Sequence, residues 1–336
     1  MLETVQSLLS ELSSGYADPR VHVFKVNAEC GEGEWVALTG QVLDDEVLST
    51  LRSTLEMQVP GLQVDYAGVK VLRSSPPKIK TVATNLTGLY ASPSWQAEML
   101  SQLFYGWQLE LLEECGKWAF VRQMDGYLGW AYLPYLTDSP SPEPTHLVIA
   151  PASYIREETS TGSQVVGRLL CGTAAQVVRW SNLWAEIDAQ VWGWASASEL
   201  RALEDLPRLS GVERRSLIVQ DATRLTGVPY LEGGCSAMGI DSSGFTQLLH
   251  RLVGIDIPRD ADMQYQAGRV VEPPFQPGDL LFFGEEGENH PITHAAVSLG
   301  GWRIIHSSRA RNGVYFDDVT DVPKLKAEFV GACTYL

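Results

Sequence analysis

The sequence predicts an α+β domain at its C-terminal end, preceded by two small β-barrels and a small N-terminal α/β module. Three observations support this fold class. Helical and strand-like runs alternate over residues 1–73, a pattern of glycine and tryptophan occurs twice between residues 80 and 203, and a glycine-rich turn, a helix and several short strands follow residue 210. At 336 residues the chain is long enough for about two to four domains.

The N-terminal module, residues 1–75, has the order helix, strand, strand, helix, strand. The segment "ETVQSLLSELS" predicts a short amphipathic helix, and residues 20–42 predict two strands joined by the turn "GEGE". Val47, Leu51 and Leu55 follow acidic capping residues at helical spacing, and "GLQVDYAGVKVL" predicts the last strand. The module resembles the small BON-type modules, and we expect it to have a structural or docking role.

An internal repeat follows the linker "RSSPPKIK". Its first copy contains Gly106, Trp118 and Gly129-Trp130, and its second contains Gly172, Trp184 and Gly193-Trp194, at offsets of 66, 66 and 64 residues. The loss of two residues falls in a predicted hairpin, where deletions are tolerated. Each copy is a run of short strands that resembles a bacterial SH3 domain. We expect small barrels at 80–137 and 146–203, with the four tryptophans packing in core and rim.

The composition excludes several classes of partner. Lys and Arg number 25 and Asp and Glu number 41, giving a net charge of −16, which argues against nucleic acid or an anionic membrane surface. No apolar stretch is long enough to span a membrane, and the N-terminus lacks the basic and apolar regions of a signal peptide. The odd number of scattered cysteines does not suggest a disulfide framework. We expect a cytoplasmic protein, or a secreted one if a signal peptide has been removed. The oligomeric state stays open.

A possible nucleophile lies in "YLEGGCSAMGIDSSGFTQLLHRL", residues 230–252. The apolar-periodic run from Phe245 to Leu252 predicts a helix, with Ser242 at or just before its N-terminus. The unpaired N–H groups and the helix dipole there stabilise an anion, such as a thiolate or a tetrahedral oxyanion. The alternative is that Ser242 is only a helix cap, since serine is among the best N-cap residues.

Two histidines favour the catalytic interpretation of this turn. His294 begins the run "HAAVSLGG" and His306 lies in "RIIHSSR", with a hairpin predicted around Gly300-Gly301. Two strands joined by that hairpin bring both imidazoles side by side. One can act as general base to a nucleophile, and the other can orient that base.

The motifs "YLEGGCSAMGIDSSGF", "QPGDLLFF", "THAAVSLGG" and "IIHSSR" resemble the successive motifs of the NlpC/P60 cysteine peptidases. The resemblance covers residues 212–336 and implies a papain-like α+β domain at 210–336. Together with the two SH3-like modules, it resembles the YkfC-type γ-D-glutamyl-L-diamino acid endopeptidases. These enzymes cleave cell-wall stem peptides after L-Ala-γ-D-Glu and recognise a free N-terminal amine. The implied partner is a muropeptide that carries diaminopimelate or Lys, and the implied role is recycling or turnover of cell-wall peptides.

The resemblance also implies roles for individual residues. Ser242 matches the nucleophile, His294 the base and His306 the orienting residue. The resemblance further implies a substrate site. Tyr230 is expected beside the oxyanion site, and Ser243 and Arg259 are expected to line the pocket. Asp260, Glu98 and Tyr127 are expected to meet the free amine. An ammonium group held by carboxylates and a phenol oxygen agrees with the strength of charge-assisted hydrogen bonds.

The sequence departs from the family pattern at two positions. Glu232 stands where the family usually has Trp, and Ser242 stands where it has Cys. Cys235 cannot substitute because it lies seven residues earlier in the chain. The serine is explained by an engineered Cys→Ser change, by a natural protein that binds muropeptides without cleaving them, or by a slow serine enzyme. We favour the engineered, inactive form because both histidines are retained.

A metal site is the remaining alternative for the histidines. His290 and His294 are four residues apart, a spacing that would bind zinc on a helix, but Pro291 makes a helix unfavourable there. The sequence contains no H-E-x-x-H motif and no glycine loop of the phosphate-binding type. We therefore expect neither a metal nor a cofactor.

Overall fold

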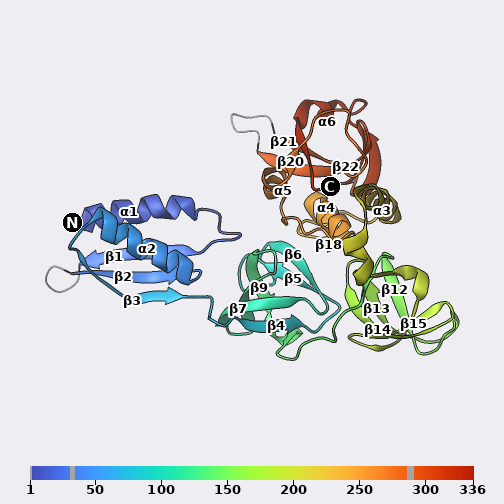
Figure 1. Cartoon of the computed structure of the whole chain (residues 1–336), viewed down its shortest axis with the longest axis horizontal. Coiled ribbons are helices and arrows are strands. Elements are labelled where there is room, and N and C mark those ends of the chain that lie inside the picture. The colour runs from blue at the N-terminus through green and yellow to red at the C-terminus, as the bar shows by residue number, and fades with distance from the viewer. Residues whose placement is uncertain (1, 31–34, 286–290) are drawn as a thin grey trace. The chain divides into compact units, whose positions relative to one another are not determined.

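The computed structural model describes residues 2–30, 35–285 and 291–336 (Figure 1). The chain divides into two compact units, one containing residues 1–80 and 108–133 and the other residues 81–107 and 134–336. The predicted "GEGE" turn, residues 31–34, lies outside the described residues, as does His290 of the metal alternative. Within these described ranges, no helix combines the length and the apolar character needed to cross a bilayer.

The first unit begins with the predicted order of helix, strand, strand, helix, strand. Its elements are α1 (Leu2–Gly15), β1 (Phe24–Cys30), β2 (Trp35–Val42), α2 (Asp45–Gln58) and β3 (Gln63–Val71). Strand β1 pairs antiparallel with β2, and β2 pairs parallel with β3, so α2 is the crossover between them. Asp44 caps α2 by accepting a hydrogen bond of 3.1 Å from the Val47 N–H. Residues of both helices and of the sheet form one hydrophobic cluster.

The two copies of the repeat contain the same antiparallel meander. In the first copy it consists of β7 (Gln108–Cys115), β8 (Trp118–Arg122) and β9 (Leu128–Tyr132), and in the second of β14 (Ala174–Ser181), β15 (Trp184–Asp188) and β16 (Trp192–Ser196). Residues 123–127 join the last two strands in the first copy, and residues 189–191 join them in the second. The two-residue deletion therefore falls in a hairpin, as the sequence predicts.

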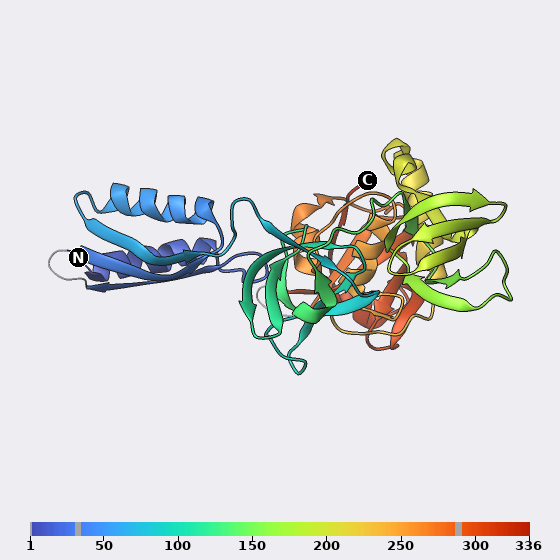
Figure 2. The same cartoon turned by 90° about the horizontal axis from the view of Figure 1, so that it is seen from below.

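The remaining barrel strands lie in the second unit. The second copy adds β11 (His146–Val148), β12 (Ala152–Arg156), β13 (Val165–Leu170), the 3₁₀ turns η2 (Ala197–Glu199) and η3 (Leu203–Arg208), and β17 (Leu200–Ala202). Its strand order is β13-β12-β16-β15-β14-β11-β17 (yellow-green in Figure 2). From the first copy, this unit holds the antiparallel hairpin of β5 (Leu86–Tyr90) and β6 (Met99–Phe104). In the same unit, the end of β4 (Lys78–Val82) pairs with β10 (Leu136–Thr137). Strand β10 follows the 3₁₀ turn η1 (Leu133–Tyr135) in the chain.

The tryptophans of the repeat are packed as expected, but to different degrees. Trp118 is buried, whereas Trp130, Trp184 and Trp194 are half-buried. The core of the second barrel is made of small and branched side chains, among them Ile155, Leu169 and Ile187. The tryptophans thus serve more as rim than as core.

The C-terminal part of the second unit is the predicted α+β domain. Three helices and a short hairpin come first: α3 (Gly211–Arg224), β18 (Cys235–Ser236), β19 (Gly239–Ile240), α4 (Ser242–Arg251) and α5 (Ala261–Ala267). The antiparallel sheet has the order β20-β25-β21-β22-β23-β24. Its elements are β20 (Arg269–Val270), β21 (Leu280–Gly284), β22 (Ile292–Gly300), β23 (Arg303–Ser308), β24 (Gly313–Asp318), α6 (Pro323–Glu328) and β25 (Phe329–Thr334). Helices α5 and α6 were not predicted.

Helix α4 is buried almost all round, which its amphipathic pattern does not predict. The residues from Ser242 to His250 are all buried, and Phe245 and Leu249 join one hydrophobic cluster with residues of β21, β22 and the second barrel. Two of the buried polar side chains of α4 are hydrogen-bonded to neighbouring segments. Thr246 Oγ1 donates to Gln264 Oε1 at 2.7 Å, and Gln247 Nε2 donates to the Ile257 carbonyl at 3.0 Å. These contacts hold the helix against the sheet and its neighbouring segments.

Candidate active site

The N-terminus of α4 is capped by Asp241, not by Ser242. The Asp241 Oδ1 atom accepts a hydrogen bond of 2.6 Å from the Gly244 N–H, and Ser242 is the first helical residue. The interpretation of Ser242 as a simple N-cap is therefore wrong. Because the neighbouring aspartate provides the cap, the serine hydroxyl is available for another role.

The Ser242 side chain lies against strand β22. Its Oγ atom accepts a hydrogen bond of 3.4 Å from the N–H of Ala295, the residue after His294. Only 6% of Ser242 is exposed. The first residue of the buried helix thus reaches the strand that carries the predicted base, although 53 residues separate the two bonded groups.

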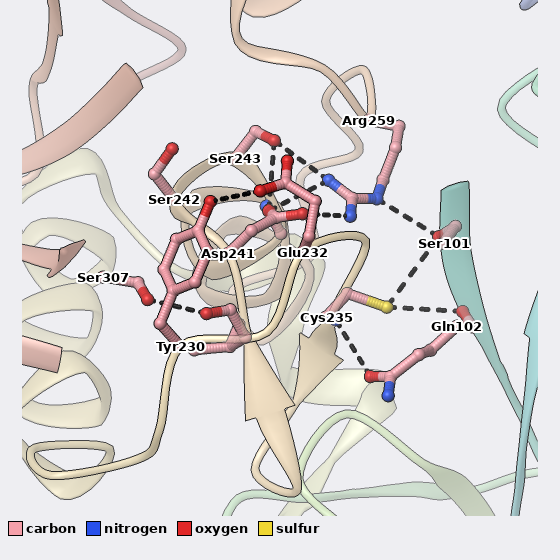
Figure 3. Close-up of polar contacts among 12 residues, drawn as sticks. Ser101, Gln102, Tyr230, Glu232, Cys235, Asp241, Ser242, Ser243, Arg259 and Ser307 are labelled. Carbon is pink, nitrogen blue, oxygen red and sulfur yellow. Dashed lines mark hydrogen bonds and ion pairs between the residues drawn. The ribbon is translucent and has the colours of Figure 1, made fainter. Parts of the chain in front are cut away.

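A buried ion pair holds the helix N-terminus in place. The Arg259 Nη2 atom lies 2.6 Å from Asp241 Oδ2, and Nη1 lies 3.2 Å from Oδ1 (Figure 3). Nη1 also donates to Ser243 Oγ at 2.9 Å, and Nε donates to Ser101 Oγ at 3.2 Å. Arg259 is 2% exposed. Ser243 and Arg259, expected as pocket-lining residues, therefore form a buried clamp on the cap residue.

The glycine turn before α4 is packed against β6. Gly233 has φ +72°, and a Cβ atom there would lie 1.9 Å from the Met99 carbonyl oxygen. Cys235, two residues later, also contacts β6. Its N–H donates to Gln102 Oε1 at 3.0 Å, and its Sγ donates to the Gln102 carbonyl at 3.3 Å. Burial raises the pKa of the Cys235 thiol. Cys235 is thus a packed residue of the turn, as expected of a cysteine that does not replace the nucleophile.

His294 and His306 are brought together as the hairpin predicts. Val297 lies opposite Ile305 in the pairing of β22 with β23, which places the two histidines on one face as diagonal neighbours. The His294 Nε2 atom is 2.7 Å from His306 Nδ1. Burial lowers the pKa of both imidazoles, with an additional contribution to His294 from the charge of His306. The lowered pKa values favour the neutral form of both rings near pH 7.

Two residues that the sequence did not indicate extend this pair. His306 Nε2 lies 2.9 Å from Asp317 Oδ2, and Asp317 Oδ1 accepts a hydrogen bond of 2.8 Å from Arg311 Nη1. Asp317 is on β24, which pairs with β23 so that His306 is opposite Tyr315. The strand-like run "GVYFDD" was a signal that could have placed this carboxylate beside His306.

Tyr230 and Glu232 form a pair at the start of the turn. Tyr230 Oη donates a hydrogen bond of 2.8 Å to Glu232 Oε2 (Figure 3), and the Tyr230 backbone bridges to Ile240 just before α4. Burial raises the pKa of Tyr230, and the carboxylate of Glu232 raises it further. The hydroxyl proton of Tyr230 is therefore committed to Glu232, at a position where the family pattern has an apolar tryptophan.

The three residues expected at an amine subsite are in different parts of the chain. Asp260 is half-buried at the N-terminus of α5, and Glu98 is exposed immediately before β6, both in the second unit. Tyr127 belongs to the first unit, where it is buried before β9.

Among residues 2–30, 35–285 and 291–336, no cluster of three or more His, Cys, Asp or Glu side chains could hold a metal ion.

Two segments of the chain match known families. Residues 227–332 match the NlpC/P60 family, and residues 89–132 match the bacterial dipeptidyl-peptidase SH3 domain. A solved NlpC/P60 family protein from Bacillus cereus is similar in fold, with a TM-score of 0.67 and 20% identity over 77% of this chain and 99% of that chain. The predicted fold class, an α+β domain of this type behind SH3-like barrels, is confirmed.

Curated relatives match this chain over shares that differ from one relative to the next. A γ-D-glutamyl-L-lysine dipeptidyl-peptidase of Bacillus cereus is 34% identical over 35% of this chain and 36% of the relative. A dipeptidyl-peptidase 6 of Lysinibacillus sphaericus is 25% identical over 69% of this chain and 89% of the relative. The chain thus spans about a third of the length of the first curated relatives it matches.

Proposed function

On the premise that residues 227–332 form an NlpC/P60 domain, we propose that the chain acts on peptides of the bacterial cell wall. The proposed bond is the one between γ-D-Glu and the diamino acid in muropeptides with a free N-terminal L-Ala. The observation that carries the proposal is the placement of Ser242 at the N-terminus of α4, with its Oγ bonded to the residue after His294. The proposed role is recycling or turnover of wall peptides, in the cytoplasm.

The proposed reaction is acyl transfer through residue 242. The side chain at 242 attacks the γ-carbonyl carbon of D-Glu, and His294 accepts its proton. The bond to the diamino acid breaks, and its amine leaves with the proton from His294. A water molecule then attacks the acyl intermediate, releases the γ-carboxylate and restores the side chain. The N–H groups at the start of α4 stabilise the tetrahedral oxyanion.

The serine at 242 limits this reaction. A helix N-terminus lowers the pKa of a cysteine enough to provide a thiolate, but a serine hydroxyl is far less acidic and must lose its proton entirely to His294. Burial keeps His294 a weak base. We therefore propose that the domain is built for a cysteine and that the Ser242 form is slow or inactive, by engineering or by nature. The codon at 242 in the natural gene distinguishes these two origins.

The amine of the substrate is proposed to meet carboxylates of the second unit. Asp260 follows the clamp residue Arg259 directly, and Glu98 precedes Met99, whose carbonyl contacts the turn at Gly233. Both carboxylates therefore come from segments that border the nucleophile turn. An ammonium group that binds there gains charge-assisted hydrogen bonds.

A cleavage assay with L-Ala-γ-D-Glu-diaminopimelate and its Lys counterpart tests the function. We expect the Ser242→Cys protein to release the diamino acid and the Ser242→Cys, His294→Ala protein to release none. The rival function is a muropeptide-binding or sensing protein that does not cleave. Binding of the peptides in calorimetry, with no cleavage by the Ser242→Cys protein, would establish the rival.

A second measurement tests the amine subsite separately. We expect N-acetylation of the peptide to weaken its binding to the Ser242 protein, and Asp260→Asn to weaken binding of the free amine but not of the acetylated peptide. Equal affinity for the two peptides would remove the amine subsite and leave the cleavage reaction untouched.

A further inference from the structure

We propose that Asp317 is a positioning residue that sets which nitrogens of His306 and His294 carry protons. The chain of contacts runs from Arg311 through Asp317 and His306 to His294. Its consequence for catalysis rests on the proposed function, whereas the proton arrangement itself does not.

The geometry of Asp317 is that of a two-sided acceptor. One carboxylate oxygen lies 2.9 Å from His306 Nε2, and the other lies 2.8 Å from Arg311 Nη1. The Asp317 side chain is 17% exposed and that of His306 is 3% exposed, so water competes little for the bond between them. The carboxylate pairs with a guanidinium, and a carboxylate in such an ion pair can only accept hydrogen bonds.

The proton arrangement follows from this acceptor. Because Asp317 can only accept, His306 Nε2 must carry a hydrogen. In a neutral imidazole the other nitrogen then has a lone pair, so His306 Nδ1 is an acceptor. The contact of 2.7 Å between Nδ1 and His294 Nε2 requires one hydrogen, which must belong to His294 Nε2. The remaining nitrogen of His294, Nδ1, is therefore left as the basic site.

The opposite arrangement would disable the base. If His306 carried its hydrogen on Nδ1, His294 Nε2 would have to accept and His294 Nδ1 would be protonated. His306 would also turn a lone pair toward an ionised carboxylate, which is electrostatically unfavourable. A carboxylate at 317 thus selects the one neutral arrangement in which His294 can take a proton.

The arrangement can be observed without any activity. Long-range ¹H–¹⁵N correlation spectra of the Ser242 protein report the tautomer of each imidazole. We expect His306 and His294 both to show the form with the hydrogen on Nε2. In Asp317→Ala we expect the His306 signals to shift toward a mixture of both forms. A hydrogen on Nδ1 of His306 in the Ser242 protein, or spectra unchanged by Asp317→Ala, would overturn the proposal.

The catalytic consequence is measured in the Ser242→Cys background. We expect Asp317→Ala to lower kcat by about tenfold or more while KM changes by less than about twofold, because Asp317 acts through its hydrogen bond with His306. The isosteric Asp317→Asn should lower kcat as well, and Asp317→Glu should partly restore it. A kcat unchanged by Asp317→Ala would contradict the positioning role.

The matched control is Asp318→Ala, which removes the same charge from the next position of β24. Asp318 accepts hydrogen bonds from Thr320 and contributes none to the histidines, so kcat should be unchanged. An equal loss in both variants would assign the effect to the strand and overturn the proposal. If the Ser242→Cys protein has no activity, the proposed function fails, but the spectra still decide the proton arrangement.

Discussion

The guanidinium of Arg259 and the carboxylate of Asp241 form a buried ion pair, with 2.6 Å between Nη2 and Oδ2, at the residue where α4 begins. The same carboxylate accepts the Gly244 N–H as the helix cap. One side chain therefore joins the loop before α5 to the helix that presents Ser242. The ion pair thus lies at the residue from which α4 starts, directly before Ser242.

We expect Arg259→Ala to lower the free energy of unfolding by about 3–5 kcal/mol, because it leaves a buried carboxylate without its partner. Urea denaturation measures this change. The control is Arg208→Ala, which breaks an exposed ion pair with Asp205 in the same unit and should cost less than about 1 kcal/mol. Similar costs for the two variants would mean that the buried pair does not hold the domain.

The turn at Gly233 provides a second prediction. Gly233→Ala introduces a Cβ atom that would lie 1.9 Å from the Met99 carbonyl oxygen, in addition to the strain of φ +72°. Gly227 has a similar φ of +84° with nothing within 4 Å of its Cβ position, so Gly227→Ala isolates the strain alone, about 1–2 kcal/mol. We expect a clearly larger loss of thermal stability for Gly233→Ala. Equal losses would show that the contact with β6 is not required.

Because His250 is buried, we expect the free energy of unfolding to fall in acid. Burial lowers its pKa from 6.5 to about 4, so the folded protein keeps it neutral while the unfolded chain takes up a proton below pH 6.5. The free energy of unfolding should fall between pH 6.5 and about 4, by about 3 kcal/mol from this residue. His250→Gln should flatten that part of the profile, measured by urea denaturation at each pH. His294 and His306 contribute in the same direction and are common to both proteins, so an identical profile would contradict the assignment.

The contact between Glu232 and Tyr230 leads to a prediction about the pKa of Tyr230. The Glu232 carboxylate accepts a hydrogen bond from the Tyr230 hydroxyl. Burial is the larger cause of the raised pKa of Tyr230, and this carboxylate raises it further. Glu232→Gln keeps an acceptor but removes the charge, so the pKa of Tyr230 should fall and still remain above its ordinary value. A titration followed by ¹³C NMR of labelled tyrosine measures this, with Tyr230→Phe identifying the signal. A pKa unchanged in Glu232→Gln would show that the charge has no effect.

Local patterns were sufficient for much of the fold. The order of elements in the N-terminal module, the repeat and the helix that begins at Ser242 all follow from apolar spacing and turn residues within short segments. The pair of histidines follows as well, because a hairpin around Gly300-Gly301 makes neighbours of His294 and His306 by local geometry alone. Helices α5 and α6 are too short for a clear apolar period and were missed.

By itself, the sequence determined that a helix starts near residue 242 and that two histidines meet on adjacent strands, because both depend on residues close together in the chain. It could not decide between Asp241 and Ser242 as the cap, since both are good N-cap residues. Only the tertiary structure decided that Asp241 is the cap, that Arg259 contacts this cap and that Asp317 contacts His306. Those contacts join side chains of different elements, and their energies come from burial and charge pairing that exist only after the elements pack.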